Sequence, residues 1–383
     1  MEAIEEFLRD RQEQGLLRKL MPASFRAAGK IYFGEKQYFD FSSNDYLGLS
    51  DHPKLKKAAV EAIDKFGVSS CASRLLSGDA EIFHQLEGAV AKFKNKEAAL
   101  IFNSGYQANV GIISALFAKG DCIFSDRLNH ASIIDAILLS GARLFRFRHN
   151  DPEHLELLLK RERKKFKNAL IVTESIFSMD GDRSPLKELV SLKEKYICQI
   201  MVDEAHATGI FGASGSGLVE EEKLSPQVDL IMGTFSKALA GFGAYLAAPR
   251  SIVDYLVNTS RSFIYSTALP PSVIAVNLAS LELIKNEPHR RKMLLSMAQT
   301  LRARLGRKGF CVKGASQIVP VILGDNLRAL AFAANLQKNG YWAVAVRPPT
   351  VPLGEARLRI SLSYLHNEEI LNKLIDAISE IRI

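Results

Sequence analysis

Short apolar runs alternate with amphipathic stretches through the middle of the chain. Each run holds three or four mostly apolar residues, and the runs lie at 99–102, 122–124, 144–147, 169–172, 199–202 and 230–232. Stretches with helical spacing separate most of them, such as the one that begins with Ser184 as N-cap and Pro185 at the first helical position. Continuously apolar strands that alternate with helices predict a mainly parallel sheet with helices on both faces.

The N-terminal region follows another pattern. Residues 2–20 have the spacing of an amphipathic helix, which Pro22 ends. Residues 31–33 and 38–41 predict a pair of short strands with Gly34 at the turn.

The C-terminal third predicts a mixed α+β arrangement. A long helix is expected from about residue 271 through residue 306. Shorter elements come after it, namely strands at 318–322, 343–346 and 358–362 and a helix near 327–338. We therefore predict an α/β protein with three parts: an N-terminal helix with short strands (1–45), a large α/β domain (46–265) and a smaller α+β domain (266–383).

The composition is that of a globular protein, with 47% hydrophobic and 24% charged residues. The formal charge of +8 raises the question of nucleic-acid binding. However, the basic residues are dispersed, and the densest run, 160–165, fits the solvated face of a helix. We interpret the positive excess as a field that steers anionic substrates, and we expect no nucleic-acid partner.

The sequence also lacks targeting signals and a metal-binding spacing of its cysteines. No apolar run reaches the ~18 residues of a membrane span, and the acidic N-terminus lacks the apolar core of a signal peptide. The four cysteines show no metal-ligand spacing. We expect a cytoplasmic protein with reduced thiols, no metal and no membrane partner.

Polar and glycine residues follow the predicted strands, at the sheet edge where α/β proteins bind ligands. The run FNSGYQ (102–107) turns from a strand into a helix, so the backbone N–H groups of Gly105 and Tyr106 would form an anion site. The plainer alternative is an ordinary strand-to-helix turn. His130 begins the helix after the next strand, where a histidine is usually only a cap.

A carboxylate and a histidine follow the strand 199–202, in the run VDEAH. Asp203 leaves a buried strand, which is costly unless a cation or hydrogen-bond donors meet it. Together with His206 it could belong to a metal site, but no third ligand follows at metal spacing. Ser178 lies in the acidic run 178–182, which lacks calcium-loop spacing and is expected to be a turn.

Lys237 follows the strand 230–232, in the run GTFSKALAGFGA. A lysine here could be a surface residue, but its apolar, glycine-rich surroundings favour a desolvated amine that acts as a nucleophile or base. Gly241 and Gly243 weakly resemble a dinucleotide-binding loop, but the third glycine of that motif is missing here. A phosphate cradle, an aromatic stacker, a carboxylate and a lysine, in this order at strand ends, are together the parts of a pyridoxal-phosphate (PLP) site.

Three motifs make the chain resemble the α-oxoamine synthases, which are fold-type I PLP enzymes: DRLNHAS at 126–132, VDEAH at 202–206 and TFSK at 234–237. The resemblance extends from Leu17 to the C-terminal strands. It implies a PLP-dependent acyltransferase that is a homodimer with shared active sites. Motifs at 41–49, 177–182 and 347–352 resemble the branch that condenses L-alanine with pimeloyl-CoA, or pimeloyl-acyl carrier protein, to 8-amino-7-oxononanoate in biotin biosynthesis.

The resemblance also implies roles for single residues. Lys237 would hold PLP as a Schiff base, Asp203 would pair with the ring nitrogen, and His130 would stack on the ring. His206 and Ser178 would bond the phenolic oxygen. The phosphate would be held by Gly105, Tyr106 and Thr234, with Ser266 and Thr267 supplied by the second subunit. The substrates would be bound by Arg359, which grips the amino-acid carboxylate, and by Arg18, Asn44, His130, Arg347 and Thr350.

Alternatives remain at this point. A relative that joins glycine to acetyl-CoA, a 2-amino-3-ketobutyrate CoA ligase, would share the cofactor residues but needs no cation for a distal carboxylate. A non-catalytic subunit with this fold would have lost the lysine, which is present. Ala240 stands where the family often has glycine, which leaves the path of the lysine loop open.

Overall fold

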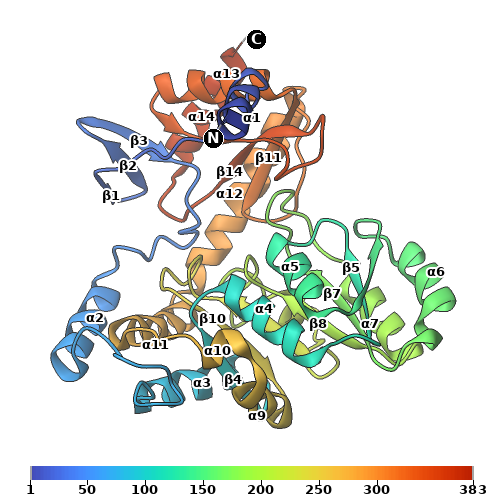
Figure 1. The fold of residues 1–383 in the computed structure, drawn as a ribbon. Helices are drawn as coiled ribbons and strands as arrows, with labels where there is room; N and C mark the ends of the chain where they lie inside the picture. Colours follow the sequence, from blue (N-terminus) through green and yellow to red (C-terminus); the bar gives the residue numbers. More distant parts are fainter. Residues whose placement is uncertain (1, 382–383) are drawn as a thin grey trace. The chain divides into compact units, whose positions relative to one another are not determined.

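The computed structural model describes residues 2–381, and the chain divides into two compact units. The larger unit contains His52–Phe177 and Arg183–Arg291 (Figure 1). The smaller unit contains the chain up to Asp51, the short segment Ser178–Asp182, and the chain from Lys292 onward.

A seven-stranded sheet forms the centre of the larger unit, in the order β4-β10-β9-β8-β7-β5-β6. Its strands are β4 (Ala98–Phe102), β5 (Cys122–Asp126), β6 (Arg143–Phe147), β7 (Ala169–Glu174), β8 (Gln199–Asp203), β9 (Leu230–Thr234) and β10 (Ala244–Ala248). All neighbours from β9 to β6 pair in parallel. The six strands predicted from apolar runs are confirmed, and so is the predicted mostly parallel sheet.

β10 was not predicted. It pairs antiparallel with both β4 and β9. The strand begins directly after Gly243, and its first residue was assigned to the glycine-rich stretch around the lysine. An antiparallel strand that follows its neighbour through a short loop needs no crossover helix, so it leaves no mark on the strand–helix alternation.

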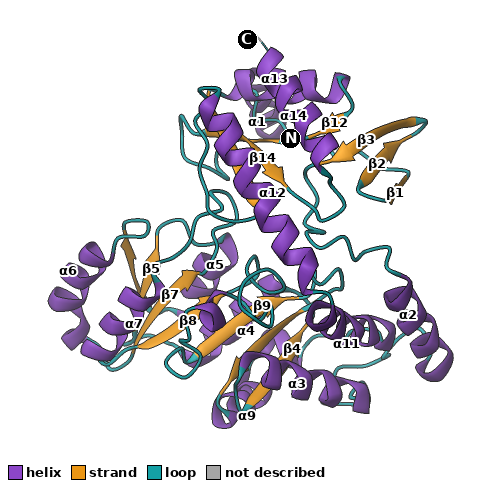
Figure 2. Cartoon of the chain, turned by 180° about the vertical axis from the view of Figure 1, so that it is seen from behind, coloured by secondary structure: helices purple, strands orange, loops and turns teal. Residues whose placement is uncertain are grey.

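Helices cover both faces of this sheet (Figure 2). The helices of the larger unit are α2 (Pro53–Phe66), α3 (Glu81–Lys94), α4 (Gly105–Leu116), α5 (Ala131–Ser140), α6 (Pro152–Glu162), α7 (Leu186–Lys195), α8 (Leu218–Glu221), α9 (Arg250–Thr259), α10 (Arg261–Ile264) and α11 (Pro271–Asn286). Ile123 and Met201 belong to one apolar cluster with residues of α4, α5 and α9. Their neighbours Phe124 and Ile200 are equally buried. Since successive strand residues point to opposite faces, both faces of the sheet are covered.

The smaller unit holds two antiparallel-rich sheets. One has the order β1-β2-β3-β12 and the other β11-β14-β13. The strands are β1 (Phe25–Ala27), β2 (Lys30–Phe33), β3 (Lys36–Asp40), β11 (Ile318–Gly324), β12 (Tyr341–Trp342), β13 (Ala345–Val346) and β14 (Ala356–Ser361), and the helices are α1 (Glu2–Glu13), α13 (Asn326–Lys338), α14 (Glu368–Glu380) and most of α12 (Pro288–Arg307). The predicted pair of strands around Gly34 is confirmed as β2 and β3.

Three helix boundaries differ from the prediction. α1 ends at Glu13 instead of residue 20, because Gly15 adopts a left-handed φ of 64°. The long helix after residue 271 is two helices, since Pro288 lacks the N–H that would continue α11. α7 begins at Leu186 with Pro185 at its N-cap.

The boundaries of the two compact units also differ from those of the three predicted parts. The predicted division at 265 separates α11 from the large domain, whereas α11 packs against α2 and belongs to the larger unit. Apart from the short segment Ser178–Asp182, the chain stays in that unit until Arg291, within α12. The predicted N-terminal part, 1–45, falls in the same unit as the C-terminal strands, because β12 pairs in parallel with β3.

A buried arginine holds the segment Ser178–Asp182 in the smaller unit. Arg357 of β14 is fully buried, and its Nη1 donates to Asp180 Oδ1 at 2.8 Å. Gly181 lies so close to β11 that a Cβ there would approach the Ile318 carbonyl to 2.5 Å. Burial of an arginine needs such a partner, so the ion pair and the glycine together place this segment beside the strands.

Two expectations about the surface can be compared with the structure. Lys160, Arg161, Lys164 and Lys165 of the basic run are exposed on α6 and the turn after it, as predicted. In the described part of the chain, every helix is too short or too polar to cross a membrane.

The four thiols should differ sharply in reactivity. Cys71 and Cys311 are exposed, whereas Cys122 and Cys198 are buried. Burial raises the pKa of Cys122 to about 12 and also raises the pKa of Cys198, and the thiolate is the reactive form. We expect a chromogenic disulfide reagent to leave Cys122 and Cys198 unreacted in the native protein and to titrate all four thiols in denaturant. Fast reaction of four thiols in the native state would contradict the burial of these two residues.

Candidate active site

A cavity of about 170 Å³ lies in the larger unit, where β7, β8 and β9 end. Its lining contains seven of the residues predicted for the cofactor: Gly105, Tyr106, His130, Asp203, His206, Thr234 and Lys237. Asn109, Ser132, Glu174, Ala205, Met232 and Ser236 complete it. The folding of the chain therefore brings together residues from strand ends that are up to 132 positions apart in sequence, between Gly105 and Lys237.

Asp203 is a buried carboxylate with two hydrogen-bond donors. The backbone N–H of Ala205 donates to Oδ1 at 2.9 Å, and Asn109 Nδ2 donates to Oδ2 at 3.1 Å. Glu174 is the register partner of Asp203 on the neighbouring parallel strand, and it is also buried in the cavity lining. Two carboxylates at paired positions make this end of the cavity a place for a cationic group.

His130 is the N-cap of α5. Its Nδ1 accepts a hydrogen bond from the Ser132 backbone N–H at 3.2 Å and lies 2.8 Å from Ser132 Oγ. Because Nδ1 is an acceptor, the ring carries its proton on Nε2. Although much of the residue is exposed, desolvation lowers the pKa of His130, the Asp203 charge opposes this, and the Lys237 charge adds to the lowering. The imidazole is therefore neutral at neutral pH.

The N-terminus of α4 has the features of an anion site. Ser104 caps the helix, its Oγ accepting from the backbone N–H of Gln107 at 3.2 Å, and Gly105 and Tyr106 stand in the first turn. A Cβ at Gly105 would meet the Thr234 methyl carbon at 2.9 Å. Thr234 Oγ1 is buried without a hydrogen-bond partner among residues 2–381. A phosphate oxygen would satisfy this hydroxyl and the first N–H groups of the helix, so the cavity fits a phosphorylated cofactor.

The Tyr106 side chain itself turns toward α5. Its hydroxyl donates to Asp135, and this hydrogen bond raises the pKa of the phenol. Only the backbone of Tyr106 is thus at hand for the predicted phosphate contact.

The loop after β9 holds Lys237 at the cavity. Lys237 is half-buried, and its carbonyl accepts from the Ala240 N–H at 2.9 Å. Ala240 adopts φ of 51°, a left-handed conformation that costs an L-residue roughly 1–2 kcal/mol. This conformation explains why glycine suits the position, and alanine is accommodated with the same turn.

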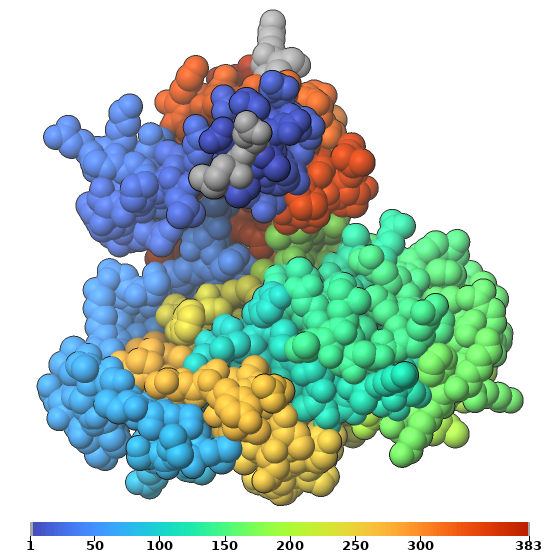
Figure 3. Space-filling view, viewed as in Figure 1, coloured from blue at the N-terminus to red at the C-terminus, as the bar shows by residue number. Residues whose placement is uncertain are grey.

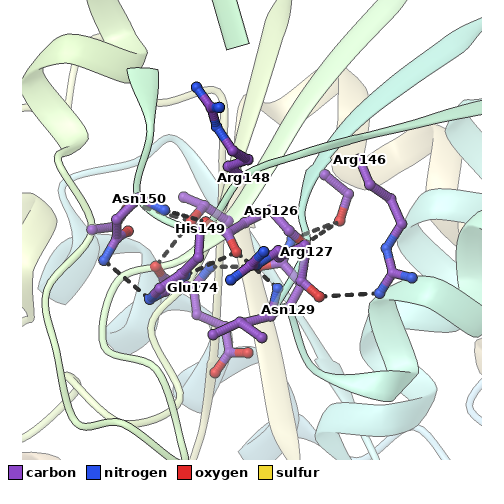
Figure 4. A network of polar contacts seen from close by, with 12 residues as sticks. Asp126, Arg127, Asn129, Arg146, Arg148, His149, Asn150 and Glu174 are labelled. Atoms are coloured by element: carbon purple, nitrogen blue, oxygen red, sulfur yellow. Dashed lines mark hydrogen bonds and ion pairs between the residues drawn. The ribbon is translucent and has the colours of Figure 1, made fainter. Parts of the chain in front are cut away.

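The segment that leads to His130 is fixed by a network of polar contacts (Figure 4). Asp126, which ends β5, accepts hydrogen bonds from the Asn150 N–H at 2.9 Å and the His149 Nδ1 at 3.0 Å. Asn129 donates to the Val172 carbonyl at 2.8 Å and accepts from the Glu174 N–H at 3.1 Å. These bonds connect the loop 126–130 to β7, so that His130 and Glu174 are held relative to each other.

Behind Asp203 the next residue, Glu204, forms a buried ion pair. Lys94 Nζ lies 2.7 Å from Glu204 Oε2, and both side chains are almost completely buried. Glu204 Oε1 also accepts from the Val219 N–H at 2.8 Å. Burial lowers the pKa of Lys94, but the charges of Glu204 and Tyr245 and the hydrogen bonds to them together outweigh burial, so the pKa is raised. The pair anchors the turn that carries Asp203 and His206.

In the smaller unit, the predicted amino-acid site is a buried cluster around Arg359. Its Nε donates to the Ser178 carbonyl at 2.6 Å, its Nη1 to Ser361 Oγ at 2.6 Å and its Nη2 to the Tyr46 hydroxyl at 3.2 Å. Asn44 Oδ1 accepts from the Tyr46 hydroxyl at 2.9 Å and lies 3.5 Å from the guanidinium. Arg359 forms no ion pair with a carboxylate of the described chain.

Two further predicted residues of this unit are neighbouring cations. Arg18 Nη2 donates to Thr350 Oγ1 at 2.8 Å, and Arg347 donates to the Gly15 carbonyl. Burial lowers the pKa of Arg347, and the charge of Arg18 lowers it further. Within residues 2–381 neither guanidinium has a carboxylate partner, so the pair offers a site for an anionic group.

Ser266 and Thr267 do not line the cavity of their own chain. Ser266 Oγ accepts from Gln107 Nε2 at 3.3 Å, and Thr267 is exposed, its carbonyl accepting from Asn103 Nδ2 at 2.7 Å. Their predicted role at the site of a second subunit stays a prediction.

Six cavity residues escaped the sequence prediction, and three of them pair with predicted ones. Glu174 lies two positions beyond the predicted end of its strand, so it was not counted as a strand-end residue. Asn109 lies four residues, one helical turn, after Gly105, and this spacing would have placed both on one face of α4. Ser132 stands two residues after His130 in the motif and was not assigned a role. In the described residues no group of three His, Cys, Asp or Glu side chains is placed to hold a metal.

Comparisons with known proteins agree with this geometry. The pattern that defines aminotransferase class I and II matches residues 36–378. The chain is 46% identical over 377 residues to the 8-amino-7-oxononanoate synthase of Geobacter sulfurreducens, covering 98% of this chain and 96% of that protein. It is 43% identical to the synthase of Geotalea daltonii, covering 100% and 98%.

Solved structures give the same result. A serine palmitoyltransferase from S. paucimobilis with a bound PLP–myriocin aldimine superposes with a TM-score of 0.93 at 30% identity, covering 98% of this chain and 96% of that one. The 8-amino-7-oxononanoate synthase from Francisella tularensis superposes with a TM-score of 0.78 at 31% identity, covering 90% and 97%. The predicted resemblance to the α-oxoamine synthases and their fold is confirmed.

Removing the lysine of the buried ion pair should destabilise the protein strongly. Lys94→Met leaves Glu204 buried without its cation, and breaking such a pair costs about 3–5 kcal/mol. We expect urea denaturation to show a loss of unfolding free energy of this size. As a control, Lys373→Met removes the cation of an exposed pair with Glu369 and should cost about 0–1 kcal/mol. Equal effects of the two substitutions would mean that the buried pair does not anchor the turn.

Proposed function

This chain belongs to the aminotransferase class I and II family, and we propose that it condenses L-alanine with a pimeloyl thioester, releasing carbon dioxide and the thiol carrier, to give 8-amino-7-oxononanoate. The relatives with 43–46% identity over nearly the whole chain carry the name of this synthase. The observation that carries the proposal is the cavity in which a lysine, a buried carboxylate and an anion site converge.

The cofactor is pyridoxal 5′-phosphate, as in the family and in the PLP-bound neighbours. When bound, it supplies an electron sink that stabilises negative charge at the α-carbon of the amino acid. We assign its phosphate to Thr234 and to the N-terminus of α4 at Gly105 and Tyr106, where the orphan hydroxyl and N–H groups lie.

Four side chains would hold the ring. Asp203 would pair with the ring nitrogen, because its carboxylate is held by two donors and favours a protonated partner. His130, neutral and fixed by Ser132, would stack on one face. His206, three residues after Asp203, would donate to the phenolic oxygen, and Ser178 is proposed to assist it.

Lys237 would both bind the cofactor covalently and move the substrate proton. Its free amine would accept the α-proton of alanine at Nζ.

The arginines of the smaller unit would bind the carboxylates of the two substrates. Arg359 would grip the carboxylate of alanine, since the donors of a guanidinium match a carboxylate and no carboxylate of the described chain neutralises it. Arg18 and Arg347, with Thr350, would bind the distal carboxylate of the pimeloyl group. An acetyl donor has no such group, and this is why we favour pimeloyl.

We propose that the enzyme is a homodimer with shared sites. The segment around Ser73 forms a bridge with Thr267 (Figure 3, light blue beside orange). Next to this bridge Leu76 is 81% exposed and Tyr265 is 72% exposed. Exposed apolar residues around the very loop that should reach another site favour its burial by a second copy.

The carrier of the acyl group and the compartment are also proposals. Either CoA or an acyl carrier protein could present the pimeloyl thioester, and the positive net charge suits both of these acidic carriers. A cytoplasmic enzyme stays our expectation.

Steady-state turnover tests the proposed reaction. L-alanine and glycine would each be offered with pimeloyl-CoA and with acetyl-CoA, and carbon dioxide and free thiol would be measured. We expect the alanine and pimeloyl-CoA pair to have the highest kcat/KM, because only pimeloyl satisfies Arg18 and Arg347. Preference for glycine with acetyl-CoA would instead identify a ketobutyrate-forming ligase.

Lys237→Ala should lose turnover and the visible absorbance of the covalently bound cofactor together, since one amine serves both purposes. The rate should fall by at least about 10⁴-fold, which is the scale of losing an essential catalytic group. Persisting condensation in this variant would sink the assignment of Lys237.

The same variant tests the dimer. Inactive Lys237→Ala subunits would be mixed and refolded with subunits that carry Ser266→Ala and Thr267→Ala. Turnover should return to about a quarter of the native value, because half of the randomly formed dimers are mixed and each has one native site. No recovery in mixed dimers would show that Ser266 and Thr267 act in their own subunit.

A further inference from the structure

Asn109 joins two groups of the cavity through one side-chain amide. It lies in the second turn of α4, is 1% exposed, and lines the cavity. Its Nδ2 is 3.1 Å from Asp203 Oδ2 and 2.9 Å from Ser132 Oγ. An amide nitrogen carries two hydrogens, so each of these contacts receives one of them.

The orientation of this amide follows from the charge of Asp203. Asn109 Oδ1 has no hydrogen-bond partner among residues 2–381. Exchanging the positions of the amide nitrogen and oxygen would not be favourable, because the oxygen would then face the Asp203 carboxylate, and both are acceptors. A charge-assisted hydrogen bond is stronger than a neutral one, so Asp203 determines which way Asn109 faces.

The second N–H continues the chain of contacts to His130. Ser132 Oγ accepts from Asn109 and lies 2.8 Å from His130 Nδ1. Since Nδ1 already accepts the Ser132 backbone N–H, the serine hydroxyl must donate to it. One amide thus connects the carboxylate proposed to meet the ring nitrogen with the imidazole proposed to cover the ring face.

We propose that Asn109 is a positioning residue of the cofactor site. Its first N–H holds Asp203 Oδ2 so that the carboxylate faces the ring nitrogen of PLP. Its second N–H orients the Ser132 hydroxyl, which keeps His130 Nδ1 an acceptor. This inference rests on the role proposed above for Asp203.

Cofactor binding to the apoprotein tests the inference without turnover. The dissociation constants of PLP and of its deaza analogue, in which a carbon replaces the ring nitrogen, would be measured for wild type and Asn109→Leu. Leucine has the same number of side-chain heavy atoms as asparagine and the same branching at Cγ, but no donor. We expect PLP to bind about tenfold more weakly to the variant, the scale of one hydrogen bond to a charged group. The deaza analogue should bind both proteins equally, because it has no nitrogen for Asp203 to meet.

A matched variant separates the two arms of the amide. Ser132→Ala keeps the bond between Asn109 and Asp203, so its preference for PLP over the deaza analogue should equal that of wild type. It removes a donor to the neutral imidazole, so the pKa of His130 in the apoprotein, followed by NMR, should rise. An unchanged His130 titration would overturn the second arm of the proposal.

The remaining outcomes are distinguishable. If Asn109→Leu weakens the binding of PLP and of the deaza analogue equally, Asn109 has a merely structural role and the inference is overturned. If Asn109→Leu keeps the wild-type preference for PLP over the deaza analogue, the inference is also overturned, but the role proposed for Asp203 stands. If wild type itself shows no preference, the assignment of Asp203 fails first. Asn109→Ala, which leaves a small space instead of an apolar group, carries the same expectation if the leucine variant does not fold.

Discussion

A carboxylate carried into the interior at the end of a buried strand is the constraint around which this site is arranged. Asp203 has to meet donors or a cation, and the fold supplies the donors from two directions: the backbone of its own turn and the side chain of Asn109 on α4. The pairing of Glu174 with Asp203 in the parallel register adds a second carboxylate to the same cavity. The result is a preorganised negative end that does not need to rearrange when a positive ring nitrogen arrives.

The next residue, Glu204, is also a buried carboxylate that needs a partner. Glu204 points into the protein instead of the cavity and is matched by the buried Lys94. Two adjacent acidic residues thus have opposite tasks, one that binds and one that anchors. In the smaller unit the situation is reversed, since Arg359, Arg18 and Arg347 are held by carbonyl and hydroxyl oxygens. Cations bound only by neutral acceptors retain their attraction for an anionic substrate.

The successes and the failures of the sequence prediction have identifiable causes. The six parallel strands were visible because each is a short, mostly apolar run and helical stretches separate most of them. β10 was not, because it is reached by a short loop directly after Gly243. The break between α11 and α12 was within reach, since Pro288 is a strong local signal, but the apolar spacing on both sides hid it. Ala240 could be recognised as a departure from the family, whereas its left-handed φ of 51° could only be observed.

The sequence by itself determined which groups would arrive at the cavity. Gly105, His130, Asp203, Thr234 and Lys237 each follow a predicted strand end within six residues, and parallel strands end at one edge of the sheet, so local pattern is enough to gather them. Only the tertiary structure decided which groups assist them. Asn109 is 94 residues from Asp203, and Lys94 is 110 residues from Glu204. Such contacts depend on which strands and helices pack together and on the direction of each side chain, which the spacing of residues along the chain does not determine.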